Sequence, residues 1–119
     1  MGTTDEYFAG HPFAADVFER VRRVVAGFGE AEVRVSRSQV ALRRRRGFAY
    51  VWLPGKYLAK PAAEVVVSFA LGRRDPSPRF KEVVQPAAGQ WMHHLEVRDP
   101  AEVDDEVRRW LREAYDRAG

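Results

Sequence analysis

The sequence predicts a small α+β domain, a two-layer sandwich in which two helices cover one face of a single antiparallel sheet. Three observations predict it. The first and last segments carry apolar residues at helical spacing, whereas residues 31–97 change to the two-residue period of strands. Each helix has one apolar stripe that must be buried. A sheet of about five strands with both helices on one face buries both stripes and leaves its other face toward water.

The first helix is expected to begin at Pro12 and to end near Gly27 and Gly29. Proline suits the first helical position, where its missing N–H group is not needed, and glycine commonly follows a helix end. The helix would bury the apolar residues that recur at steps of three and four, which are Phe13, Val17, Val21, Val24, Val25 and Phe28.

The closing helix is expected to follow Asp99. Asp99 and Glu102 match a capping box, in which each of the two side chains accepts a hydrogen bond from the backbone of the other residue, and Pro100 occupies the first helical position. The apolar stripe of this helix would consist of Val103, Val107, Trp110, Leu111 and Ala114.

About five strands are expected between the helices. Residues 33–35 and 40–42 alternate between apolar and polar side chains, as half-buried strands do. The stretches FAYVWL (48–53) and EVVVSFAL (64–71) are apolar on both faces, as central strands are. WMHHLEVR (91–98) is a further strand, and FKEVVQ (80–85) is compatible with one. The order is therefore α-β(about 5)-α.

Length and composition indicate one domain over residues 1–119, because no linker, repeat or low-complexity tract divides the chain. The sequence has no cysteine, which excludes a disulfide framework, a thiolate metal site and a thiol nucleophile. No secretory signal is evident at its start, and no apolar run approaches the roughly 18 to 20 residues that span a bilayer. We expect a cytoplasmic protein without a membrane partner.

The basic residues are concentrated in the middle of the chain. Residues 34–81 hold twelve lysines and arginines against only Glu64 and Asp75, whereas both flanking segments are acidic. Such a division concerns surface potential rather than fold. We expect the middle segment to form one continuous positive region that binds a polyanion.

The stretch RGFAYVWL (46–53) fits seven of the eight positions of a signature from the RNA recognition motif, and only Leu53 fails. The second signature and the β-α-β-β-α-β order of that fold are missing, so chance similarity is favoured. Alternation along a strand would place Phe48, Tyr50 and Trp52 on one face. If that face meets water, the aromatic side chains form a stacking surface for bases. If it meets the helices, they are core residues.

Four consecutive arginines, Arg43, Arg44, Arg45 and Arg46, precede this strand. One interpretation is a solvated hairpin end that the acidic turn at residues 104–106 or solvent ions partly neutralise, although surface ion pairs contribute only about 0 to 1 kcal/mol each. The other is a site for phosphates or carboxylates, which the guanidinium group binds with two parallel hydrogen bonds.

The histidines do not predict a metal site. His93 and His94 are adjacent on a predicted strand and so point to opposite faces. His94 would share a face with Glu96, but His11 is the only other histidine and a complete ligand set is not expected. His93 is expected to be a core residue.

No catalytic pattern is evident. The nucleophile elbow, the phosphate loop and the dinucleotide-binding glycines are missing. The serines have no neighbouring base in the sequence; they are Ser36, Ser38, Ser68 and Ser77. We expect a non-catalytic domain with no catalytic residues, no metal and no cofactor.

The stretch GQWMHHLEVRDPAEVDDEVRRWLREAYDRAG (89–119) resembles the closing strand and helix of the YjbR and MmcQ-like proteins. The wider pattern SRSQVALRRRRGFAYVWLPGKYL, RDPSPRFKEVV and WMHHLEV is similar to a bacterial domain-of-unknown-function family that covers nearly the whole chain. Both resemblances imply a frataxin-like (CyaY-like) α-β sandwich. The YjbR and MmcQ group is often labelled DNA-binding by prediction.

The resemblance to frataxin implies a metal-handling role, since frataxin is an iron chaperone with an acidic ridge along its first helix. This sequence departs from that pattern, because Asp16 and Glu19 are accompanied by Arg20, Arg22 and Arg23. Three functions are therefore carried forward. They are a basic binding module for nucleic acid or another polyanion, a protein-interaction or structural domain that docks an acidic partner or a second copy of itself, and a metal-handling domain.

Overall fold

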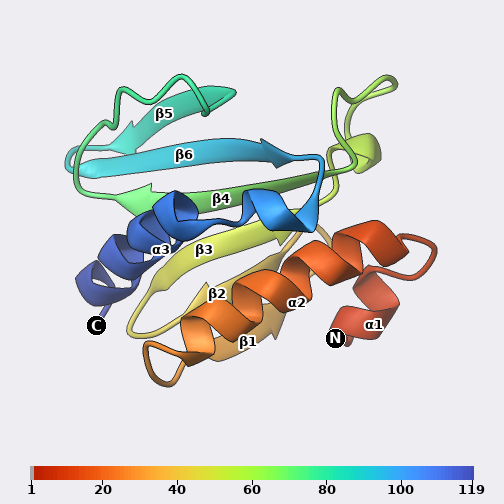
Figure 1. The fold of residues 1–119 in the computed structure, drawn as a ribbon, viewed down its shortest axis with the longest axis horizontal. Coiled ribbons are helices and arrows are strands. Elements are labelled where there is room, and N and C mark those ends of the chain that lie inside the picture. Colours follow the sequence, from red (N-terminus) through yellow and green to blue (C-terminus); the bar gives the residue numbers. More distant parts are fainter. Residues whose placement is uncertain (1) are drawn as a thin grey trace.

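The computed structural model describes residues 2–119 and shows a two-layer α+β sandwich (Figure 1). Its helices are α1 (Thr4–Tyr7), α2 (Pro12–Ala26) and α3 (Asp105–Arg117), with short 3-10 turns at Pro54–Lys56 and Pro100–Glu102. Its strands are β1 (Glu32–Val35), β2 (Val40–Arg43), β3 (Gly47–Trp52), β4 (Val65–Leu71), β5 (Glu82–Ala87) and β6 (Gln90–Val97).

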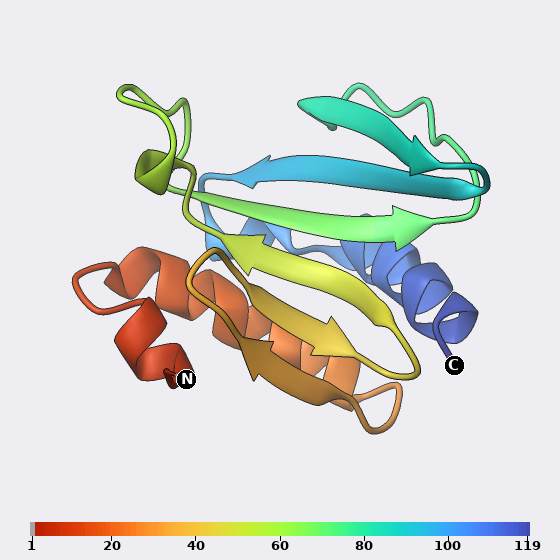
Figure 2. The same cartoon turned by 180° about the vertical axis from the view of Figure 1, so that it is seen from behind.

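The strands form one antiparallel sheet in the order β1-β2-β3-β4-β6-β5. Helices α2 and α3 both lie on one face of it (Figure 1), and the opposite face carries no helix (Figure 2). The general α+β prediction, with both helices on one face, is confirmed. Among residues 2–119 no helix is both long enough and apolar enough to cross a membrane.

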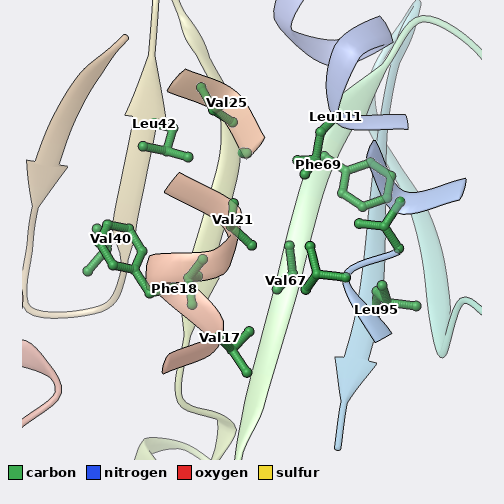
Figure 3. Close-up of a cluster of buried hydrophobic side chains, with 14 of the residues drawn as sticks. Val17, Phe18, Val21, Val25, Val40, Leu42, Val67, Phe69, Leu95 and Leu111 are labelled. Atoms are coloured by element: carbon green, nitrogen blue, oxygen red, sulfur yellow. The ribbon is translucent and has the colours of Figure 1, made fainter. Parts of the chain in front are cut away.

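The hydrophobic core fills the space between the helices and the sheet (Figure 3). Alternate residues of each strand point to the helices because side chains alternate along a strand. Helix α2 contributes the buried residues Val17, Phe18, Val21 and Val25, the sheet contributes Val40, Leu42, Val67, Phe69 and Leu95, and α3 contributes Leu111. The predicted stripe of the closing helix is buried at every position.

Residues 82–87 form a sixth strand at the sheet edge, which agrees with the possible strand at residues 80–85 apart from its bounds. Residues 4–7 form a short helix that was not predicted, with its own capping box between Thr3 and Glu6. The edge strand is mostly exposed, which explains why its sequence lacks the apolar pattern of the inner strands. The short helix has too few residues to show a helical period.

The start predicted for the closing helix was wrong. Asp99 caps only the 3-10 turn, accepting a hydrogen bond from the Ala101 N–H group at 2.8 Å. Glu102 accepts from the Arg98 N–H group, so the reciprocal box is not formed. The true cap is Asp104, which accepts from the Val107 N–H group at 3.1 Å. Two cap signals therefore follow one another, and the second begins α3.

A β-bulge interrupts the pairing of β2 with β3. Leu42 pairs with Ala49, but the next residue of β2, Arg43, pairs with Gly47. Phe48 is therefore an extra residue on β3. An inserted residue of this kind breaks the alternation of faces along the bulged strand.

The bulge sends Phe48 to the helix side, where it is 1% exposed and packs edge-on against Tyr115 of α3 with ring centroids 5.5 Å apart. Tyr50 and Trp52 point to the opposite, uncovered face and are half-buried. The prediction that these three aromatic residues share one face was wrong for Phe48, because strict alternation takes no account of an inserted residue.

Replacing Phe48 by alanine should lower the free energy of unfolding by about 3 to 5 kcal/mol, since it removes a buried aromatic ring from the core. Leu58→Ala is the control, because Leu58 is 47% exposed; its cost should stay within about 0.5 kcal/mol. Urea unfolding measures both. Equal, small losses in the two variants would show that Phe48 is not a core residue.

Candidate functional site

A pocket of about 420 Å³ lies on the uncovered face of the sheet. Its lining comes from the turn before β2 and from β3, β4 and β6, and consists of Gln39, Tyr50, Trp52, Ser68, Met92 and His94. The register explains why these residues meet, because Tyr50 lies opposite Ser68 and Ser68 lies opposite His94. Residues that face each other across strands share one face. The pocket is therefore aromatic, with polar groups at its floor.

A chain of hydrogen bonds crosses this floor. The Trp52 indole N–H group donates to Ser68 Oγ at 2.9 Å. Ser68 Oγ lies 2.6 Å from His94 Nδ1, and the rings of Trp52 and His94 pack edge to face with centroids 5.9 Å apart. Ser68 is only 2% exposed, so its hydroxyl needs these partners. The chain fixes the two rings that form the walls.

Burial controls the ionisation of the pocket. Desolvation lowers the pKa of His94, and the charge of nearby Lys81 lowers it further, while Glu82 acts in the opposite direction. His94 is therefore neutral at neutral pH. Burial also raises the pKa of Tyr50, which keeps its hydroxyl protonated. The pocket presents uncharged aromatic and polar surfaces.

The Ser68–His94 contact places a hydroxyl beside a base, which is one requirement of an acyl-transfer site. Such a site needs N–H donors aimed at the developing oxyanion. Ser68 lies inside β4, between β3 and β6, where the antiparallel ladders engage the backbone N–H groups on both sides. Sequence reasoning found no base near Ser68, and the fold supplies one through space, but in a position suited to support rather than to nucleophilic attack.

Three of the four consecutive arginines hold the end of α3. Arg44 donates to the Tyr115 carbonyl oxygen at 2.9 Å and stacks over the Tyr115 ring at 4.1 Å. Arg45 donates its backbone N–H to the Ala118 carbonyl at 3.0 Å, and Arg46 donates to the Arg117 carbonyl at 3.1 Å. The last carbonyls of a helix are the negative end of its dipole, so cations stabilise them.

The charges of this run stay largely available. Arg44, Arg45 and Arg46 are exposed, and of the four only Arg43 lies within 4.0 Å of a carboxylate among residues 2–119, 3.8 Å from Glu32. The alternative in which the acidic turn at residues 104–106 neutralises them was wrong. Asp104 and Glu106 pair with Arg79 instead, at 3.1 and 2.8 Å.

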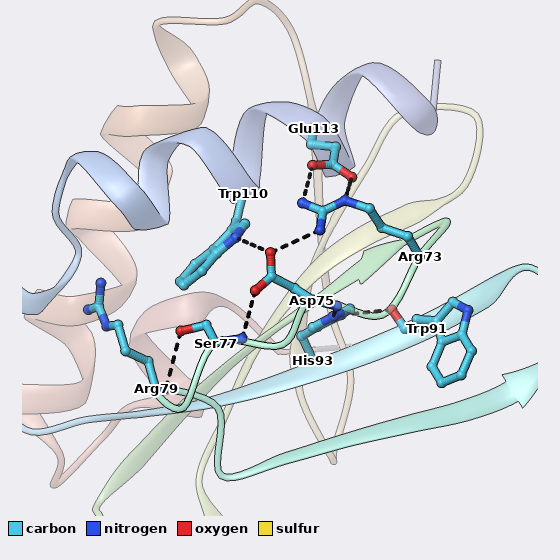
Figure 4. A network of polar contacts seen from close by, with 8 residues as sticks. All are labelled: Arg73, Asp75, Ser77, Arg79, Trp91, His93, Trp110 and Glu113. Atoms are coloured by element: carbon cyan, nitrogen blue, oxygen red, sulfur yellow. Dashed lines mark hydrogen bonds and ion pairs between the residues drawn. The ribbon is translucent and has the colours of Figure 1, made fainter.

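The basic segment as a whole does not form one continuous positive region, so that prediction was wrong. Lys56 lies in the loop after β3, at the opposite end of that strand from the arginine run. Arg73 is paired with both Glu113 and Asp75, at 2.8 and 3.0 Å (Figure 4). What remains is a smaller cationic cluster at the β2–β3 hairpin, which we call the arginine hairpin (residues 43–46).

The loop between β4 and β5 is fixed by a polar network around Asp75 (Figure 4). The Asp75 carboxylate accepts hydrogen bonds from Arg73, from the Ser77 N–H group and from the Trp110 indole at 2.9 to 3.1 Å. Burial opposes its ionisation, but these donors outweigh burial and lower the pKa of Asp75. The network ties the loop to α3. Arg73 and its neighbours in the network therefore stabilise the fold.

His93 is the core histidine that the sequence predicted. It is fully buried; Nδ1 lies 3.1 Å from the Trp91 carbonyl, and Nε2 accepts from the Asp75 N–H group at 3.0 Å (Figure 4). His94 points to the other face, as expected. Within residues 2–119 no group of three or more histidine, cysteine, aspartate or glutamate side chains is placed to hold a metal ion.

The sequence signal for the pocket was incomplete. Tyr50 and Trp52 were singled out, and the structure brings them together with Ser68, Met92 and His94, whereas Phe48 is separated from them. A serine inside an otherwise apolar strand was the available signal. Its partner could not be inferred, because alternation along one strand does not give the register between strands.

Stability should fall as the pH drops below about 6.5. Burial lowers the pKa of His93 from its ordinary value of 6.5, so below that value the unfolded chain binds a proton that the folded chain excludes. The loss is at most about 1.4 kcal/mol per pH unit for this residue, and His94 acts in the same direction.

Urea unfolding between about pH 7.5 and 5.5 measures the effect, a range in which histidines titrate and ordinary carboxyl groups do not. His93→Gln should be less stable but should show a shallower dependence on pH. A wild-type stability that stays constant over this range would contradict the assignment.

Arg44→Ala should lower the free energy of unfolding by about 1 to 2 kcal/mol, because it removes both a charge at a helix C-terminus and a cation–π contact. Arg45→Ala is the matched control, since the Arg45 contact to α3 uses its backbone; the change should stay within about 0.5 kcal/mol. Thermal or urea unfolding checks both. Equal losses would refute the capping role of the Arg44 side chain.

Comparison with known proteins gives one match. Residues 4–118 match the family described as Domain of unknown function (DUF5655). Neither the curated proteins nor the solved structures contain a significant match. The matched region includes the arginine hairpin, the pocket and the network around Asp75. Because the match covers nearly the whole chain, the protein belongs to the DUF5655 family of domains of unknown function.

Proposed function

We propose that this domain is a non-catalytic binding module that holds single-stranded nucleic acid along β3. Bases would stack on Tyr50 and Trp52 on the uncovered face of the sheet, and phosphates would meet the arginine hairpin. The observation that carries the proposal is the aromatic pocket on a sheet face that no helix covers.

The two aromatic rings suit this task because both are half-buried and both line the pocket. Tyr50 and Trp52 are two residues apart on one strand, a separation of about 7 Å. Stacking on an aromatic side chain contributes about 1 to 3 kcal/mol per base and does not depend on which base is present. The Trp52 ring, which Ser68 and His94 hold in place, loses little conformational freedom when a ligand binds.

The arginine hairpin supplies positive charge at the start of β3, the end of the strand nearer to Tyr50. It directly precedes β3, and the Tyr50 hydroxyl lies against Gly47, where an added Cβ would collide with it. The Arg43 charge acts on Tyr50, lowering its pKa against the larger effect of burial. Phosphates next to a base stacked on Tyr50 would therefore lie near the Arg43 guanidinium, a group that binds phosphate oxygens in pairs.

The same hairpin favours a second candidate, a protein-interaction domain that docks an acidic partner. Exposed arginines bind carboxylates as well as phosphates. This candidate makes no use of the aromatic pocket, and that difference separates it from the first. A metal-handling role, the third candidate, has no ligand group of three or more residues within 2–119.

Kinship with the YjbR and MmcQ-like proteins would have the same implication as the first candidate, since that group is labelled DNA-binding by prediction. A frataxin-like relationship would explain the layer arrangement but not the binding surface. Both are proposals that rest on the closing strand and helix (residues 89–119) and on the order of elements.

A fluorescently labelled single-stranded oligonucleotide of mixed sequence should bind, and its affinity should fall steeply with salt, with a log–log slope of about −0.7 for each phosphate neutralised. Trp52→Ala should weaken binding by about 5- to 150-fold, the loss of one stacked base. Arg45→Ala should reduce the salt slope by about one phosphate.

Val84→Ala is the control for the aromatic variant, because Val84 is an exposed apolar residue on the edge strand β5. It should bind like the wild type. Absence of binding at low salt would end the proposal. Binding that depends on Arg45 but is unchanged by Trp52→Ala would favour the acidic-partner candidate instead.

A further inference from the structure

The hydrogen bonds at the floor of the pocket have a fixed donor-to-acceptor direction. The Trp52 indole can only donate, so Ser68 Oγ accepts from it. The Ser68 hydroxyl hydrogen must then find an acceptor, and His94 Nδ1 lies 2.6 Å away. Because Ser68 is 2% exposed, water does not replace this partner. His94 Nδ1 therefore accepts, and the hydrogen of the neutral ring is on Nε2.

Protonation of His94 would disturb this arrangement. A hydrogen on Nδ1 would face the Ser68 oxygen, which already accepts from Trp52, and the buried hydroxyl hydrogen would lose its acceptor. Desolvation and the Lys81 charge, which lower the pKa of His94, act in the same direction against the opposing effect of Glu82. Glu96, two residues after His94 on β6, is paired with Lys81 and Arg98. The Nε2–H donor is thus a constant feature of the pocket.

A hydrogen-bond acceptor lies beside this donor. Glu82 on the edge strand β5 is directly opposite His94 on β6, so the two side chains share the uncovered face. Glu82 is exposed, and its charge acts on His94. An ionised carboxylate only accepts hydrogen bonds. His94 lines the pocket and Glu82 lies on the neighbouring strand, so one donor and one acceptor stand side by side at the edge of this face.

We infer that the pocket recognises the hydrogen-bonding edge of a nucleobase, a ring that offers an acceptor atom to His94 Nε2–H and an adjacent N–H group to Glu82. This inference deepens the proposed function and rests on it. An aromatic side chain of a partner protein, such as phenylalanine, would fill the same space but would leave both polar groups unmatched. An unmatched donor on half-buried His94 is costly, and that cost distinguishes the two kinds of ring.

The test uses two free nucleosides, guanosine and N1-methylguanosine. Both are neutral and have the same fused ring, but the methyl group removes the N–H donor that lies next to the O6 acceptor. NMR titration, read at the Trp52 indole N–H signal, should show that N1-methylguanosine binds the wild type at least about ten-fold more weakly, the effect of one hydrogen bond to a charged group.

Glu82→Ala should abolish the difference between the two nucleosides, since the group that accepts from N1–H is gone. Val84→Ala, two residues away on the same strand, should keep it. In the free protein, nitrogen-15 NMR should find His94 as the Nε2–H tautomer at neutral pH, and Ser68→Ala should weaken that preference. These variants change exposed residues or one small hydroxyl, and a folded spectrum confirms that each is intact.

Equal binding of the two nucleosides by the wild type, no binding of either, or an Nδ1–H tautomer of His94 in the free protein would overturn this inference. Failure of this inference can be told apart from failure of the proposed function. If oligonucleotides bind through Trp52 while the two nucleosides are not distinguished, only edge recognition is lost. If oligonucleotides do not bind, the proposed function fails as well.

Discussion

The structure depends on one constraint, which is that its two long helices bury only one face of a six-stranded sheet. The stripes of α2 and α3 are both directed at the same side, where valine, leucine and phenylalanine side chains fill the core. No layer of helices covers the other face, so its own side chains must shield the strands from water. This face does so with small residues in the central strand, Val66, Ser68 and Ala70, each 2% exposed, beneath larger side chains from the flanking strands. The aromatic pocket is a consequence of that arrangement.

The β-bulge at Phe48 divides the aromatic residues of β3 between these two faces. One ring packs against α3, and two stay on the open side. The adjoining arginine hairpin contacts α3, since Arg44 and Arg46 donate to its last carbonyls, and both residues are nevertheless exposed. A structural role and a binding role are therefore compatible in the same four residues. The run of arginines is explained in part by the helix end alone.

Much of the fold could be predicted from the sequence, because it rests on local patterns. Helical spacing and Pro12 located α2, the two-residue period located the half-buried strands, and continuous apolar runs located β3 and β4. The helix start at Asp104 could not be chosen over Asp99, since both have the chemistry of a cap. The bulge at Phe48 is a property of pairing with β2, which alternation along one strand does not contain.

Only the part of the candidate site that lies on a single strand could be predicted from the sequence. Tyr50 and Trp52 could be placed together, but the Ser68–His94 contact joins residues 26 positions apart and depends on the register of β4 with β6. The distribution of charge was the least predictable property. Arg79 and Arg73 belong to the basic middle of the sequence, yet α3 supplies carboxylates that pair with both. Sequence position does not reveal such pairing, because it forms only when distant elements pack.

The proposed function requires that the uncovered sheet face, and not a helix surface or the hairpin alone, receives the ligand. The most direct measurement is an intermolecular NOE experiment on the complex with a short single-stranded oligonucleotide. NOEs are expected from base protons to the ring protons of Trp52 and Tyr50. NOEs confined to the hairpin arginines or to α2 and α3, with none to these two rings, would contradict it.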